Sequence, residues 1–183
     1  MKCISLPNES WRDGAVGMRH IISLLVENEA GALSRIAGLF SARAYNIESL
    51  TVAPTIDPSM SRMTIVTSGS DSIIEQITKQ VNKLVDVIRV VDLNEQKHVE
   101  RELLLIKLHV VNDTREEIKR ICAGFNARMI DDSENTCTIE LADTSERLEN
   151  FIRSFESSYI VEMVRSGVTG IALGSTNITN IQV

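Results

Sequence analysis

The chain has 183 residues, of which 43% are hydrophobic, 24% charged and only 4% aromatic, and its formal net charge at pH 7 is -6. This composition is typical of a globular protein of one or two domains. The negative net charge argues against sequence-independent binding of nucleic acid as the function, since such binding needs clusters of basic residues. No stretch of the sequence approaches the roughly 20 consecutive apolar residues that a membrane-spanning helix requires. The cysteines Cys3, Cys122 and Cys137 have no paired spacing, which favours reduced thiols in a cytoplasmic protein.

Residues 1–17 stand apart from the rest of the chain. They contain Pro7, Gly14 and Gly17, and no apolar run long enough for a secretory signal. We interpret them as a flexible extension or as the result of an upstream start site.

The periodic part of the first half begins with an apolar run at 20–26, which predicts a strand. A helix follows, with an expected core face of Leu33, Ile36, Ala37 and Phe40. Strands are expected at 47–53 and 62–67, on either side of a turn-rich loop. Ser72 and Glu75 are spaced as a capping box for a second helix, and an apolar run over 85–91 predicts the last strand.

The second half repeats this β-α-β-β-α-β order. Alternating apolar residues predict a strand over 104–110, followed by a helical stripe at 118–125 that starts at Asp113 or Thr114. Short strands at 127–131 and 136–141 flank an acidic turn. A second helical stripe, Leu148, Phe151, Ile152 and Phe155, precedes a closing strand at 159–164.

These patterns together predict an α+β protein made of two tandem ferredoxin-like βαββαβ units. The expected organisation is an extension at 1–17, a first unit at 18–94, a polar linker at 95–101, a second unit at 102–168 and a tail at 169–183.

Few residues indicate catalysis or metal binding. The histidines His20, His98 and His109 occur singly, without a cysteine or carboxylate at metal-ligand spacing. Cys122 and Cys137 fall on expected core positions. No glycine-rich phosphate motif follows a strand. We therefore predict no catalytic residue and no metal ligand in this chain.

The acidic turn at 131–134 has two interpretations. Its carboxylates suit a divalent cation. It is otherwise a hairpin turn that its charge keeps solvated, and this is the interpretation that we favour.

The turn from Asn28 to Gly31, between the first strand and the first helix, is the most informative segment. Its glycine lets a ligand approach the main chain, and the unpaired N–H groups of a helix start favour a carboxylate or phosphate. With apolar neighbours, the turn suits an amino acid. The alternative is a helix cap formed by Asn28 beside an incidental glycine. The corresponding turn at 112–115 lacks glycine and carries Asp113, so binding is expected in the first unit only.

Several strings of the sequence resemble one family. They are VENEAGALSR at 26–35, YNIESLTV at 45–52, SRMTI at 61–65, KLVDV at 83–87 and VEREL at 99–103. They resemble the small regulatory subunit of acetohydroxyacid synthase (acetolactate synthase), whose N-terminal half is an ACT domain. The resemblance covers roughly residues 18–168.

The resemblance implies a non-catalytic regulatory subunit that forms a homodimer through its ACT domains. Its partner, the large catalytic subunit, carries thiamine diphosphate, Mg²⁺ and FAD, and condenses pyruvate with pyruvate or 2-ketobutyrate. The small subunit is implied to bind none of these cofactors, to stimulate its partner and to confer feedback inhibition by valine in branched-chain amino acid biosynthesis. Leucine and isoleucine remain open as effectors.

The effector site that the resemblance implies maps onto Asn28, Gly31, Ala32, Leu33 and Ser34 of one chain and Asn46 and Ile47 of the other. Main-chain N–H groups near Gly31 would take the carboxylate, an asparagine the ammonium, and Leu33 and Ile47 the aliphatic group. Ala44 stands where the family leads us to expect glycine. A left-handed conformation there would cost alanine about 1 kcal/mol.

Other functions remain open. A stand-alone ACT regulator of another enzyme or of transcription is one, although no helix-turn-helix segment is apparent. An acylphosphatase-like hydrolase would need a basic loop after the first strand, where residues 27–29 are acidic instead. A metal carrier would need a Cys-x-x-Cys motif. The second unit is expected to serve dimer contact or binding of the catalytic subunit.

Overall fold

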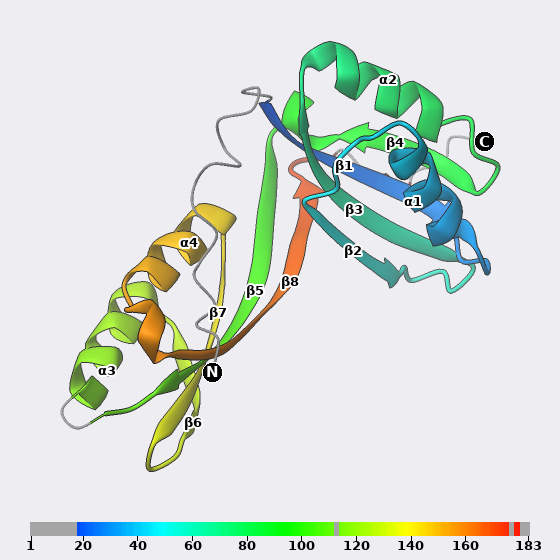
Figure 1. Ribbon diagram of the computed structural model, residues 1–183. Coiled ribbons are helices and arrows are strands. Elements are labelled where there is room, and N and C mark those ends of the chain that lie inside the picture. The colour runs from blue at the N-terminus through cyan, green and yellow to red at the C-terminus, as the bar shows by residue number, and fades with distance from the viewer. Residues whose placement is uncertain (1–17, 112–113, 176–177, 180–183) are drawn as a thin grey trace. The chain divides into compact units, whose positions relative to one another are not determined.

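The computed structural model describes residues 18–111, 114–175 and 178–179. The described residues divide into two compact units, the first comprising those up to residue 99 and from residue 168 onward, and the second those between 100 and 167. Each has a four-stranded antiparallel sheet and two α-helices, in the order β-α-β-β-α-β (Figure 1). The predicted α+β class and the tandem ferredoxin-like arrangement are confirmed. No helix of the described residues is long and apolar enough to cross a membrane.

The first unit has the sheet order β2-β3-β1-β4. Its elements are β1 (Met18–Glu27), α1 (Ala32–Ala42), β2 (Ser49–Pro54), β3 (Met60–Gly69), α2 (Asp71–Val81), β4 (Val87–Asp92) and the short 3-10 helix η2 (Leu93–Glu95). The central strands β1 and β3 pair over their full length, from Met18 opposite Gly69 to Glu27 opposite Met60.

The second unit has the sheet order β6-β7-β5-β8. Its elements are β5 (His98–His109), α3 (Thr114–Phe125), β6 (Arg128–Asp132), β7 (Thr136–Asp143), α4 (Ser145–Arg153), η3 (Ser157–Tyr159) and β8 (Ile160–Ala172). Its core includes Cys122 and Cys137, which are free thiols at the predicted core positions. Burial raises the pKa of both thiols.

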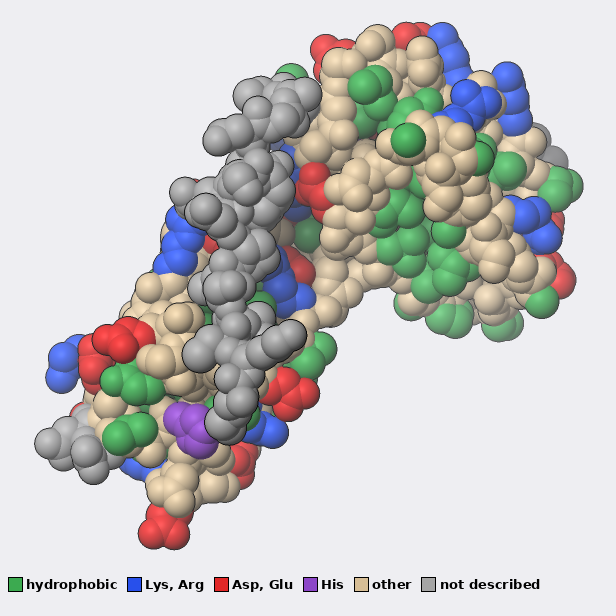
Figure 2. All heavy atoms as spheres, in the orientation of Figure 1, with side chains coloured by type: hydrophobic (Ala, Val, Ile, Leu, Met, Phe, Trp, Pro, Cys, Tyr) green, Lys and Arg blue, Asp and Glu red, His purple; other side chains and the backbone are tan. Residues whose placement is uncertain are grey.

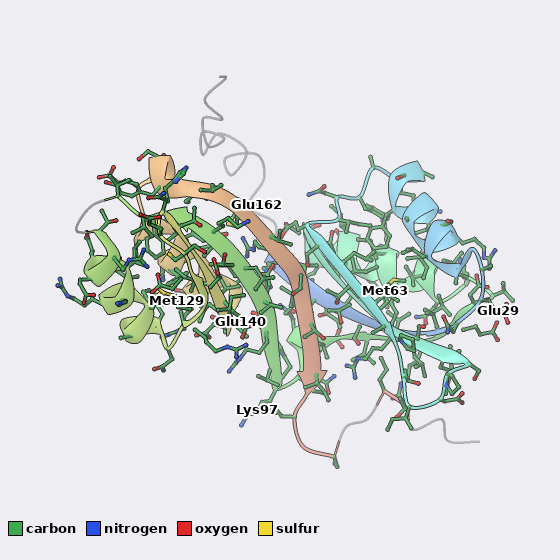
Figure 3. All side chains as sticks on the ribbon, turned by 90° about the horizontal axis from the view of Figure 1, so that it is seen from below. Glu29, Met63, Lys97, Met129, Glu140 and Glu162 are labelled. Carbon is green, nitrogen blue, oxygen red and sulfur yellow. The ribbon has the colours of Figure 1, made fainter. Side chains whose placement is uncertain are left out.

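The helix-covered face of the first sheet carries the main core of the first unit. Alternate strand residues point to this face, among them Met63, which is labelled in Figure 3, and they meet one side of each helix. The fully buried side chains of this core are worth about 1.5–3 kcal/mol each relative to exposure. The buried members are Ile22, Leu24, Val26, Ile36, Phe40, Met63, Ile65, Ile74, Ile77 and Val81.

The opposite face of the same sheet is also covered. Ile21, Val66, Leu93 and Val168 form a second buried cluster there, and Thr64 is only 2% exposed. The end of β8 supplies this cover: the Val168 N–H donates to Ser49 Oγ at 3.2 Å, and Thr51 Oγ1 donates to the Val168 carbonyl at 2.9 Å. β3 is therefore buried on both faces.

The expected start of a tail at residue 169 differs from the structure, because β8 continues to Ala172. Gly170 is buried, and a Cβ at this position would lie 2.7 Å from Leu93 Cδ1. Glycine is thus needed for close packing against η2. The predicted extension at 1–17 lies outside the described residues.

Two expectations about helix ends and faces were wrong. α2 begins at Asp71 after Ser70, and Glu75 forms an ion pair with Lys79 at 2.5 Å, so Ser72 and Glu75 do not make the capping box. Leu33 is 43% exposed, because the buried stripe of α1 runs through Ala32, Ile36 and Phe40. The stripe is displaced by one residue at its N-terminal end.

α1 and α3 end in the same way. Ala44 has φ 55° and Asn126 has φ 56°, both in the left-handed region. The next N–H in each case reaches back into the last turn, from Tyr45 to the Phe40 carbonyl at 3.0 Å and from Ala127 to the Cys122 carbonyl at 2.8 Å. These are the bonds of a helix end that favours glycine or asparagine.

We predict that Ala44→Gly stabilises the protein, by about 1 kcal/mol in the free energy of unfolding, because glycine has no Cβ strain at positive φ. Urea denaturation followed by circular dichroism measures the change. Ala42→Gly, on the last helical residue of α1, is the matched control and should be destabilising. A lower denaturation midpoint for Ala44→Gly would contradict this account of the helix end.

Candidate functional site

The turn after β1 is anchored to the loop between β2 and β3. The Asn28 N–H donates to the Ser59 carbonyl at 2.8 Å, and its side-chain Nδ2 donates to the Pro58 carbonyl at 3.0 Å. The turn runs through Glu29, labelled in Figure 3, to Gly31. Asn28 therefore does not cap α1, and this part of the alternative interpretation was wrong.

Gly31 occupies the N-cap position of α1 with φ 91°, in the left-handed region, so it is not incidental. No side chain caps this helix end. The Ala32 N–H donates to the Glu29 carbonyl at 3.2 Å, which leaves the N–H groups of Leu33 and Ser34 without a side-chain acceptor. Gly31, Leu33 and Ser34 are exposed, so a ligand can reach this helix end.

The other predicted site residues lie at the far end of α1. Asn46 is exposed, and its carbonyl accepts a hydrogen bond from Thr67 Oγ1 at 2.6 Å. Ile47 is half-buried against the core. Since α1 has 11 residues, about 17 Å of helix separates its two ends. Within one chain, the groups at Gly31 and Asn46 cannot contact the same small ligand.

The structure contains an ion pair close to Gly31 that was not predicted from the sequence. Arg35 donates two hydrogen bonds to the Asp86 carboxylate, from Nε to Oδ2 at 2.5 Å and from Nη2 to Oδ1 at 2.6 Å. Asp86 is only 4% exposed. The hydrogen bonds from Arg35 hold the pKa of Asp86 below its usual value. The pair ties the first turn of α1 to the segment before β4. No sequence signal links two residues 51 positions apart.

The same arginine restricts residue 31. A Cβ on Gly31 would lie 3.0 Å from Arg35 Nη1, so a side chain there must displace the guanidinium. Positive φ and this contact together explain why glycine occupies the turn.

Of the three histidines considered as catalytic or metal-binding residues, His20 has a carboxylate partner that is distant in the sequence. Its Nδ1 lies 2.7 Å from Asp92 Oδ2, because β1 and β4 are neighbouring strands. No group of three or more His, Cys, Asp or Glu in the described part of the chain lies close enough to hold a metal ion.

The acidic turn between β6 and β7 is tied to an arginine. Arg115 forms an ion pair with Asp132 and donates to the carbonyls of Ser133 and Glu134 at 2.8 and 2.9 Å. Ser133 Oγ donates to Asp131. This arrangement matches the solvated hairpin that we favoured over a cation site. Asp113, the alternative helix start, lies outside the described residues.

Comparison with known proteins identifies relatives of both units. Residues 22–89 match the family model described as AHAS small subunit-like ACT domain, and residues 101–174 match the model described as small subunit of acetolactate synthase. The acetolactate synthase small subunit of Haemophilus influenzae is 50% identical over 162 residues, which are 88% of this chain and 99% of the relative.

Two further relatives extend the comparison. The acetolactate synthase isozyme 3 small subunit of Salmonella typhimurium is 52% identical over 158 residues, covering 86% of this chain and 97% of that protein. The crystal structure of the acetolactate synthase small subunit from Thermotoga maritima superposes with a TM-score of 0.80 at 34% identity, covering 87% of this chain and 99% of that one.

We predict that Gly31→Ala lowers the free energy of unfolding by about 1–2 kcal/mol, the cost of a Cβ in the left-handed region. Gly38→Ala is its matched control. Gly38 is in the interior of the same helix, with nothing within 4 Å of an added Cβ, so alanine there should stabilise by about 0.5–1 kcal/mol. Changes of the same sign in both variants, measured by urea denaturation, would contradict the assigned conformations.

We predict that Asp86→Asn destabilises the protein in a pH-dependent way. The pKa of Asp86 is lowered in the folded state, so its ionised form adds stability above the unfolded-state pKa of about 3.9. That stability is lost as the pH falls through the lower folded-state pKa. The difference in unfolding free energy between wild type and Asp86→Asn should therefore be constant at neutral pH and shrink in acid. A pH-independent difference would argue against the ion pair.

Proposed function

The chain belongs to the family of acetolactate synthase small subunits, and on that premise we propose that it regulates a catalytic subunit in the cytoplasm. It raises the activity of that subunit and makes it sensitive to feedback inhibition by valine. The chain has no turnover of its own. Thiamine diphosphate, Mg²⁺ and FAD, and the condensation of 2-oxo acids, belong to the large subunit.

The uncapped start of α1 at Gly31 is the observation that carries the effector proposal. The α-carboxylate of valine accepts hydrogen bonds from the free N–H groups of Leu33 and Ser34, where the helix dipole also favours a negative charge. The ammonium group is taken by the side-chain oxygen of Asn28 or Asn46. The exposed Leu33 and the half-buried Ile47 enclose the isopropyl group.

The proposed contact residues lie at opposite ends of α1, and this separation supports a site formed by two chains of a homodimer. A twofold axis beside α1 brings the N-terminal end of one helix next to the C-terminal end of its partner, so one ligand contacts Gly31 of one chain and Asn46 of the other. β2 is an edge strand, and its Val52 is 45% exposed. Hydrophobic side chains also gather on the surface of the first unit over α1, β2 and β3 (Figure 2). This surface suits a second copy.

The energy required is modest. A feedback sensor with a Kd between about 10 μM and 1 mM needs roughly -4 to -7 kcal/mol. A few charge-assisted hydrogen bonds and one buried branched side chain are sufficient. Leucine and isoleucine differ from valine by one methylene, which such a pocket distinguishes by about 1–3 kcal/mol. Inhibition further requires that valine bind one arrangement of the complex more tightly than another.

The test is reconstitution of the Gly31→Asp variant with its catalytic subunit, followed by acetolactate formation at increasing valine. We predict that stimulation is retained and that the valine concentration for half-inhibition rises at least about tenfold, because a fixed carboxylate occupies the anionic position. Asp is among the residues that tolerate positive φ. Ser72→Asp is the matched control, since it adds the same charge to the start of α2, and its valine response should be normal.

Unchanged valine inhibition in a folded, stimulating Gly31→Asp variant would overturn the site. Failure of the wild-type chain to stimulate any acetolactate synthase catalytic subunit would overturn the regulatory function itself. Isothermal titration with valine, leucine and isoleucine then identifies the effector.

A further inference from the structure

A cavity of about 350 Å³ lies on the face of the first sheet opposite the one that α1 covers. Its walls come from β3, from β4 with the residues that follow it, and from residues 171–175 and 178. The polar side chains in these walls are Arg62, Arg89, Gln96 and Ser175, and the remainder are mostly apolar. None of the described residues that line the cavity is acidic.

The sheet register places the two arginines side by side. Leu25 of β1 lies opposite Arg62 of β3 on one side and opposite Arg89 of β4 on the other. Residues directly opposite each other on neighbouring strands project from the same face. With neighbouring strands about 4.8 Å apart, the Cα atoms of the two arginines are roughly 10 Å apart. Both long cationic side chains therefore line the same cavity.

Arg62 is half-buried and is bonded to neutral oxygen atoms. Its Nε donates to Ser23 Oγ at 3.1 Å, and its Nη2 donates to the Gly170 carbonyl at 3.0 Å. A guanidinium has five N–H donors, so these two bonds leave it unsaturated. Burial lowers the pKa of Arg62, because the charged form loses hydration.

A buried charge without a counter-charge is costly. Two other arginines of the chain have carboxylate partners: the half-buried Arg165 pairs with Glu102 and Glu149, and the exposed Arg35 pairs with the buried Asp86. Among the described residues, the hydrogen-bond partners of Arg62 are Ser23 and Gly170, and no carboxylate is among them. A bound anion would compensate its charge.

We propose that this cavity binds a small oxyanion, the phosphate or carboxylate group of a small molecule, between Arg62 and Arg89. The guanidinium fork fits both groups with paired, charge-assisted hydrogen bonds. Gln96 and Ser175 add neutral donors, and the apolar wall accepts a short carbon skeleton. This site is separate from the effector turn, and its existence does not depend on the regulatory function proposed above.

Occupancy has a structural consequence. The ligand bridges β3 and β4 to the segment 171–175, which forms one wall of the cavity. Amide hydrogen exchange of that segment should slow when the cavity is filled, because opening it would release the anion.

The test uses the full chain and two probes, inorganic phosphate and acetate, each compared with sodium chloride at equal ionic strength. We expect saturable binding of at least one probe by calorimetry, with slower exchange over 171–175. A preference for phosphate indicates a phosphorylated compound, and a preference for acetate a carboxylic acid. Arg62→Gln should weaken binding about tenfold to a hundredfold, the worth of a hydrogen bond to a charged group. Arg62→Lys should weaken it less.

Arg128→Gln is the matched control, because it removes one positive charge from an exposed ion pair in the second unit, and its affinity should equal that of the wild type. If Arg62→Gln fails to fold, Arg89→Gln decides, with the same expected loss. Absence of saturable binding of both probes to folded wild-type protein would overturn the proposal. So would wild-type affinity in both the Arg62→Gln and the Arg89→Gln variants.

Discussion

The full-length pairing of β1 with β3, buried on both faces of the sheet, is the constraint on which the first unit depends. Ten residues of each strand are in register, with the helices on one face and η2 and the end of β8 on the other. Asn28 directly follows β1, and Arg62 projects from β3. Because buried strands cannot shift register without moving apolar side chains out of the core, both candidate sites inherit fixed positions from this pair.

The two units have the same order of strands and helices, but different residues connect the start of the first helix of each unit to the neighbouring loop. In the first unit, Asn28 bonds to the loop between β2 and β3, and glycine at position 31 leaves the helix start open. In the second unit, Arg115 bonds to the corresponding loop between β6 and β7. A charged side chain from the helix thus makes in the second unit the loop contact that Asn28 makes in the first. The expectation of effector binding in the first unit only depends on Gly31, because the turn at 112–115 has no glycine.

The helix ends show how closely the repeat is kept. Ala44 and Asn126 adopt nearly the same left-handed conformation after α1 and α3. Asparagine is a favourable residue there, whereas alanine carries a strain of about 1 kcal/mol. Ala44 is two residues before Asn46, one of the proposed ligand contacts, so the strain lies at the far end of the helix that begins after Gly31. Nothing in the structure explains why alanine is used.

The sequence by itself determined the order of elements, the two-unit repeat, most of the core and the family. Period and spacing are local properties, and the strings at 26–35 and 45–52 are contiguous. It also identified Gly31 as exceptional and Ala44 as a left-handed candidate. The seven predicted site residues cluster at the two ends of α1, as their sequence positions imply.

Only the tertiary structure decided which distant residues meet. The pairs Arg35–Asp86 and His20–Asp92, and the alignment of Arg62 with Arg89 across Leu25, join residues far apart in the chain. The cover of the first sheet by residues 168–172 likewise depends on where β8 ends. Such contacts are set by strand order and register, and a single sequence without its fold contains no local signal for them.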